Sequence, residues 1–158
     1  MLDDLVTIAL KAGAAIMAIY ARFDPATMAT KGDGSPVTEA DAAAEALILE
    51  ELARLAPEIP VVAEEAVAAG QVPETGRRFF LVDPLDGTTN FLHGLPHWAI
   101  SIALEHKGEI VAAVVFDAAK DEMFTAERGD GAFLNDRRIR VSARRQMTES
   151  IFATGVPF

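Results

Sequence analysis

The chain has 158 residues, 51% of them hydrophobic, and carries 14 Lys plus Arg against 24 Asp plus Glu, for a net charge of −10. One packed domain is therefore expected, and the acidic balance argues against a nucleic-acid polymer as partner, because such binding needs a basic surface. The absence of cysteine excludes disulfides, thiolate metal sites and a cysteine nucleophile, so the metal ligands available are mainly carboxylates, which suit hard ions such as Mg²⁺ or Mn²⁺.

No targeting or membrane segment is evident. The start of the chain, Met1 to Asp4, carries no basic residues of the kind that begin a signal peptide. The longest early apolar run lies between Lys11 and Arg22 and is about half of the roughly 20 residues that a membrane span needs. We therefore expect a cytoplasmic protein without a membrane partner.

Two amphipathic helices are predicted in the first third of the chain. Apolar residues recur in steps of three and four over residues 2–19 and again over residues 44–55, which is the spacing of one buried helical face. The second helix should begin near Thr38 and end at Pro57. Residues 23–36, which are rich in Gly, Pro and Asp, predict a loop between the two helices.

Two short buried strands should follow the helices. The apolar run at residues 59–63 predicts a strand that carries the pair Glu64-Glu65 at its end. After a polar loop, residues 79–82 predict a second strand. It should end abruptly at Asp83-Pro84, because proline cannot continue a central ladder.

The next part of the chain reads as an antiparallel meander. In residues 98–104 every second side chain is large and apolar, Lys107-Gly108 makes a turn, and residues 110–116 form a returning strand. Further turns and short strands continue to about residue 141. Two helices packed on a mostly antiparallel sheet make an α+β domain.

The segment from Asp83 to Phe91, with the sequence DPLDGTTNF, carries the most chemical information. Two carboxylates three residues apart leave a buried strand, and Gly87 permits a close backbone approach to a ligand. The side chains of residues 88–90 can cap a following helical turn, whose free N–H groups would attract an anion. The segment therefore fits carboxylates for a cation beside amides for a phosphate, although an Asp-Pro turn before a helix cap remains an alternative.

Two other acidic positions are candidates for the same site. Because strand side chains alternate, one member of the pair Glu64-Glu65 can face a cation and the other solvent; a solvated strand end is the alternative. Asp41 lies in Thr38-Glu39-Ala40-Asp41, which fits a helix capping box and equally a base at a helix start.

Taken in order, Asp41, Glu64-Glu65 and the run from Asp83 to Thr88 resemble the signature of the lithium-sensitive phosphomonoesterases, the superfamily of inositol monophosphatases, bisphosphate nucleotidases and fructose bisphosphatases. The ordered set is far more specific than any one motif. The resemblance implies the first half of a layered αβαβα fold, and hydrolysis of a small-molecule phosphate monoester by direct attack of water. It also implies about two or three Mg²⁺ ions and a homodimer in the complete enzyme.

The resemblance also implies metal ligands. Glu64, Asp83 and the backbone carbonyl of Leu85 would hold the first Mg²⁺. Asp83 would bridge to a second ion that is also held by Asp86, and Asp86 would in addition face the hydroxyl groups of the substrate.

The remaining roles fall on the turn after the strand and on the second helix. The N–H groups of Gly87 and Thr88 would hold phosphate oxygens. Thr88, hydrogen-bonded to Asp41, would orient and deprotonate the attacking water, so these two residues are the predicted catalytic pair.

Two parts of the chain resemble different branches of the superfamily. Residues 89–91, the segment around Trp98 and residues 127–141 are similar to inositol monophosphatases. Residues 31–41 and 79–83 look more like bacterial 3′(2′),5′-bisphosphate nucleotidases. The part nearest the predicted metal site favours the inositol monophosphatase branch.

The resemblance also predicts how the chain divides. Residues 1–158 would form an amino-terminal α+β domain that carries the metal site, and the carboxy-terminal α/β layer of the family would be absent. In the family that layer supplies one more metal-binding Asp. We therefore expect little activity from this chain alone, and a truncated, inactive metal-binding or assembly module is the alternative of another class.

Overall fold

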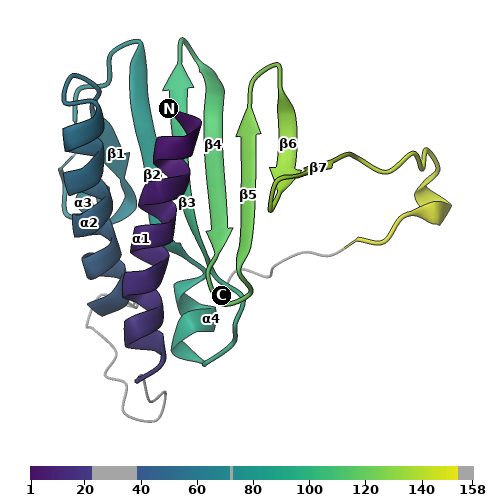
Figure 1. The fold of residues 1–158 in the computed structure, drawn as a ribbon, viewed down its shortest axis with the longest axis horizontal. Helices are drawn as coiled ribbons and strands as arrows, with labels where there is room; N and C mark the ends of the chain where they lie inside the picture. The colour runs from purple at the N-terminus through teal and green to yellow at the C-terminus, as the bar shows by residue number, and fades with distance from the viewer. Residues whose placement is uncertain (23–38, 72, 153–158) are drawn as a thin grey trace.

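The computed structural model describes residues 1–22, 39–71 and 73–152 (Figure 1). The predicted loop at residues 23–36 and the predicted helix start at Thr38 lie outside these ranges. The elements, in chain order, are helices α1 (Leu2–Tyr20) and α2 (Glu39–Leu55), strand β1 (Val61–Ala63), helix α3 (Glu64–Ala68), strand β2 (Arg78–Asp86), helix α4 (Thr88–Leu92), strands β3 (Ala99–His106), β4 (Glu109–Asp117), β5 (Glu122–Glu127), β6 (Gly131–Leu134) and β7 (Arg137–Ile139), and a 3₁₀ turn (Met147–Glu149).

All seven strands form one sheet in the order β1-β2-β3-β4-β5-β6-β7. Only β1 and β2 are parallel, and each later pair is antiparallel. Helices α1 and α2 pack against each other and lie along one face of this sheet, with α2 near β2 and α1 near β4 (Figure 1). The predicted α+β class with two helices on a mostly antiparallel sheet is therefore confirmed.

The core lies between the two helices and the sheet. Because strand side chains alternate, each central strand sends every second residue towards the helices. These residues are fully or almost fully buried: Phe80 and Val82 on β2, Ile100, Ile102 and Leu104 on β3, and Val114 and Phe116 on β4. The helical stripes that meet them include Leu5, Ile8, Ala12 and Ile16 on α1 and Ala44, Ile48 and Leu52 on α2. The opposite face of the sheet is partly exposed, as Leu81 and Val115 show.

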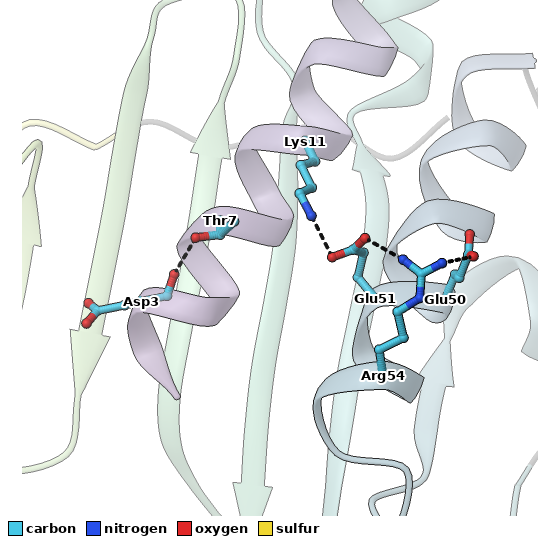
Figure 2. Close-up of polar contacts among 6 residues, drawn as sticks. All are labelled: Asp3, Thr7, Lys11, Glu50, Glu51 and Arg54. Atoms are coloured by element: carbon cyan, nitrogen blue, oxygen red, sulfur yellow. Dashed lines mark hydrogen bonds and ion pairs between the residues drawn. The ribbon is translucent and has the colours of Figure 1, made fainter.

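Charged side chains join the two helices on their outer surface (Figure 2). Lys11 of α1 lies 2.7 Å from Glu51 of α2, and Arg54 pairs with both Glu51 and Glu50. These ion pairs are largely exposed, so they contribute little compared with the buried interface beneath them. None of the helices in the described part of the chain is long and apolar enough to cross a membrane.

The predicted strand at residues 59–63 ends where expected, at Ala63, but it begins two residues later, at Val61. The conformation predicted for Glu64-Glu65 is wrong, because these residues form the first turn of the five-residue helix α3 and not the end of a strand. A helix start is a favourable place for acidic residues because the amino-terminal end of a helix carries partial positive charge.

The close approach of α1 to β4 yields a prediction. A Cβ atom at Gly13 would lie 2.5 Å from the ring of Phe116 and 3.1 Å from the Cβ of Ala118. Ala favours a helix over Gly by about 1 kcal/mol, but overpacking costs about 1–3 kcal/mol. We therefore expect Gly13→Ala to lower the free energy of unfolding measured in urea.

The control is Ala14→Gly at the next, exposed position, which should cost about 1 kcal/mol through helix propensity alone. A more stable Gly13→Ala protein would mean that Phe116 moves aside without cost.

Candidate active site

The carboxyl end of β2 carries a bulge that brings two Asp side chains to the same face. Asp83 is paired with Ser101 and Asp86 with Ala99, so three steps on β2 correspond to two steps on β3. Three steps of regular strand would place the two carboxylates on opposite faces, and the extra residue returns them to one face. The prediction that the strand ends at Asp83 is therefore wrong. Pro84, which has no N–H to donate, lies inside the bulge, and β2 resumes its pairing at Asp86.

The turn after the bulge is held by its own hydrogen bonds. The N–H of Leu85 donates to Oδ1 of Asp83 at 3.2 Å, and the hydroxyl of Thr88 donates to the carbonyl oxygen of Leu85 at 2.9 Å. The carbonyl predicted as a metal ligand is thus already oriented by Thr88. The predicted hydrogen bond between Thr88 and Asp41 remains a prediction.

Gly87 directly precedes helix α4, and two constraints require glycine at this position. Its φ of 90° lies in the left-handed region, and a Cβ atom would lie 2.9 Å from the carbonyl oxygen of His97. The expectation that the side chains of residues 88–90 cap the helix is wrong, because Gly87 is the N-cap and makes no side-chain capping bond. The backbone of this turn packs closely against His97 and Trp98, the two residues that precede β3.

Asp83 lies in a repulsive electrostatic environment. Burial, and then the carboxylates of Glu64 and Asp86, raise its pKa to about 7, and a hydrogen bond with Glu64 acts in the same direction. The N–H of Leu85 opposes this shift. Glu64 from α3 and Asp86 from β2 thus both lie near enough to Asp83 to act on its charge, and their role as metal ligands remains a prediction.

Asp41 belongs to the same acidic cluster. It lies in the first turn of α2 and is only 4% exposed. Burial raises the pKa of Asp41 to about 7, with further contributions from Glu65, Glu64, Asp83 and Glu45, in that order. A buried carboxyl group with a pKa near neutrality can accept a proton at the pH at which an enzyme works.

Glu45 is a member of this cluster that the sequence reasoning missed. Its Oε2 accepts the backbone N–H of Glu65 at 3.1 Å, so it fixes the start of α3 against α2. The signal was present in the sequence, because Glu45 lies four residues after Asp41 and therefore on the same helical face.

The donor set fits a hard divalent cation. No ion pair between described residues involves Glu64, Asp83 or Asp86, so their mutual repulsion is not offset by a described basic side chain. Within the described residues, no three Asp, Glu, His or Cys side chains are placed so that they could hold an ion, and Glu64 and Asp83 share a hydrogen bond instead. When two carboxylates share a proton, a divalent ion that binds both of them can displace that proton.

The raised pKa of Asp83 predicts a pH-dependent cost in the metal-free protein. An Asp with a pKa of 3.8 when unfolded and about 7 when folded stabilises the fold most below pH 4, and this contribution is lost as the pH rises through about 7. Asn at this position carries no charge. We expect Asp83→Asn in EDTA to raise the Tm by several degrees at pH 8 and by less at pH 5.

The matched control is Glu58→Gln, which removes an exposed carboxylate outside the cluster and should give no such pH-dependent gain. A Tm for Asp83→Asn that differs from wild type equally at both pH values would contradict the electrostatic explanation.

The chain is similar to known proteins along its whole length. Residues 1–158 match the model of the inositol monophosphatase family. The inositol-1-monophosphatase of Rhizobium meliloti is 46% identical over 99% of this chain and 58% of that protein. Nus factor SuhB of Escherichia coli K12 is 42% identical over 100% of this chain and 58% of that protein.

Among solved structures, the IMPase of Thermotoga maritima superposes with a TM-score of 0.78 at 38% identity, over 90% of this chain and 54% of that one. The chain thus spans less than two thirds of the curated relatives it matches. The match to the family model runs along its whole length, and the chain belongs to the inositol monophosphatase family.

Proposed function

We propose that the protein containing this chain is a Mg²⁺-dependent phosphomonoesterase that hydrolyses a small polyol phosphate, with inositol monophosphate as the first candidate. The observation that carries the proposal is the cluster of Asp41, Glu64 and Asp83, in which burial and mutual repulsion raise the pKa of two carboxyl groups to about 7. The turn at Gly87 directly follows Asp86, and its left-handed backbone and close contact with His97 and Trp98 fix the start of α4, whose first N–H groups would face a phosphate. A cytoplasmic location, a homodimer and the absence of a nucleic-acid partner are parts of the same proposal.

Each residue of the cluster has a distinct role in the proposed reaction. Glu64, Asp83 and the carbonyl of Leu85 would hold one Mg²⁺, and Asp83 and Asp86 would hold a second. Bound Mg²⁺ supplies positive charge that stabilises the attacking and leaving oxygens of an in-line displacement. Asp86 also accepts hydrogen bonds from the hydroxyl groups of the substrate.

The remaining residues bind the phosphate and move a proton. The N–H groups of Gly87 and Thr88 donate to phosphate oxygens and orient the phosphorus for attack. Asp41 would accept a proton from the attacking water through the hydroxyl of Thr88, which would first have to turn its hydrogen from the carbonyl oxygen of Leu85 to Asp41. The P–O bond to the alcohol breaks as the new P–O bond forms. The leaving alkoxide takes a proton from solvent water, and Asp41 returns its proton to solvent.

Metal binding can be tested on this chain directly. We expect calorimetry to detect Mn²⁺ binding, and we expect Asp83→Asn to weaken it by at least about tenfold, because even residues that only support metal ligands contribute that much. Glu58→Gln is the control with the same change of charge. Equal Mn²⁺ affinity of wild type and Asp83→Asn would refute the assignment of the metal site.

The catalytic pair can be tested in the full-length protein. Asp41→Asn and Thr88→Ala should each reduce kcat by about 10²- to 10⁴-fold, the usual contribution of a positioned base, and leave Mn²⁺ affinity nearly unchanged. If Asp41→Asn lowers the Tm while the rate stays the same, then Asp41 serves only to cap α2.

The second candidate is a 3′(2′),5′-bisphosphate nucleotidase, which the sequence of residues 31–41 and 79–83 favours. Phosphate release from inositol monophosphate and from adenosine 3′,5′-bisphosphate, measured side by side on the full-length protein, separates the two. We expect a higher kcat/KM for inositol monophosphate, and a clear preference for the nucleotide would replace the proposal with this candidate. Mn²⁺ binding without turnover of either substrate would favour the inactive module.

A further inference from the structure

Residues 87–97 form a compact segment that carries the proposed phosphate-binding backbone. The N–H of Phe91 donates to the carbonyl oxygen of Gly87 at 3.1 Å, and the side-chain amide of Asn90 donates to the carbonyl oxygen of His97 at 2.8 Å. The N–H of Leu95 also donates to the carbonyl oxygen of Asn90 at 2.9 Å. These hydrogen bonds connect Gly94 and Leu95 to Asn90 and, through α4, to Gly87 and Thr88.

Tyr20, at the end of α1, attaches this segment to the helical layer. Its hydroxyl donates to the carbonyl oxygen of Gly94 at 3.0 Å, across a sequence separation of 74 residues. Its ring lies 5.1 Å from the ring of Phe91 and 5.5 Å from that of Trp98, measured between centroids. Phe91 is fully buried and Trp98 is 3% exposed, so Tyr20 closes an aromatic cluster beneath α4.

The same end of α1 lies beside α2, where Asp41 is found. The two helices pack along their length, and Arg22 forms an ion pair with Glu39 in the first turn of α2 at 2.8 Å. That ion pair is exposed on both sides and is therefore weak. The ring of the half-buried Tyr20, packed against the buried Phe91 and Trp98, is the firmer link between the helical layer and the segment after β2. The hydrogen bond of its hydroxyl to Gly94 is itself exposed.

We propose that Tyr20 is a positioning residue for the active site, which sets the backbone of Gly87 and Thr88 relative to Asp41 through its hydrogen bond to Gly94 and its contact with Phe91. This role rests on the proposed function. Tyr20 touches neither metal nor substrate, so its effect is confined to the phosphate-binding side of the site. Glu64 and Asp83 lie on α3 and β2, outside the segment that Tyr20 holds.

The test compares Tyr20→Phe, which keeps the ring and removes the hydroxyl, with Thr7→Val. The hydroxyl of Thr7 also donates to a backbone carbonyl, that of Asp3, at 2.9 Å, but does so inside α1 and far from Gly94 in the chain (Figure 2). Three quantities are measured on each protein: amide hydrogen exchange of residues 87–97, Mn²⁺ affinity, and the affinity for inorganic phosphate in the presence of Mn²⁺.

For Tyr20→Phe we expect exchange of residues 87–97 to accelerate, and phosphate affinity to fall, by about three- to tenfold each, as the loss of one hydrogen bond implies. Mn²⁺ affinity should stay at the wild-type value, and Thr7→Val should change none of the three quantities. In the full-length enzyme, Tyr20→Phe should lower turnover without changing the Mg²⁺ concentration needed for half-maximal rate.

Other results would overturn the inference. Wild-type phosphate affinity in Tyr20→Phe, or an equal fall in Mn²⁺ and phosphate affinity that follows a lower Tm, would reduce Tyr20 to a structural residue and leave the proposed function intact. If the wild-type chain binds neither Mn²⁺ nor phosphate, then the proposed function fails and the positioning role fails with it.

Discussion

Mutual repulsion among carboxylates is the constraint on which the rest of this structure depends. Asp41, Glu64 and Asp83 come from three different elements, and the charged forms of Asp41 and Asp83 are less favourable because of their acidic neighbours. In water such groups would move apart, because nothing local in the sequence holds them together. The fold keeps them within reach because α2, α3 and β2 are fixed by a shared apolar core. Packing of the apolar core therefore offsets the repulsion that these carboxylates add to the folded state.

Several structural features hold these carboxylates close together. The bulge in β2 returns Asp83 and Asp86 to one face of the sheet. Glycine at position 87 permits a left-handed turn directly against His97 and Trp98, so helix α4 starts immediately after Asp86. Glu45 holds the start of α3 by accepting the N–H of Glu65. Each feature costs local regularity, and such irregularities are common at the sites where proteins bind ligands.

Family membership and geometry bear on different questions. The match to the inositol monophosphatase family covers the whole chain, whereas the chain covers 58% of the curated relatives. The roles proposed for the cluster and for the turn at Gly87 concern the metal and the phosphate. The polyol and nucleotide candidates differ in the part of the substrate that lies away from the phosphate. Measuring turnover of both substrates therefore decides between them.

The sequence by itself determined the class of fold and the positions of the candidate ligands. The steps of three and four in residues 2–19 and 44–55 predicted α1 and α2, and the alternation after Trp98 predicted the antiparallel strands, because periodicity follows from local backbone geometry. The order of Asp41, Glu64 and the run from Asp83 to Thr88 indicated the chemistry. Only the tertiary structure decided the bulge at Pro84, the helical start at Glu64, and the contacts of Glu45 with Glu65 and of Tyr20 with Gly94. The contacts among these features join residues up to 74 positions apart, and a local sequence pattern does not predict which distant residues come into contact.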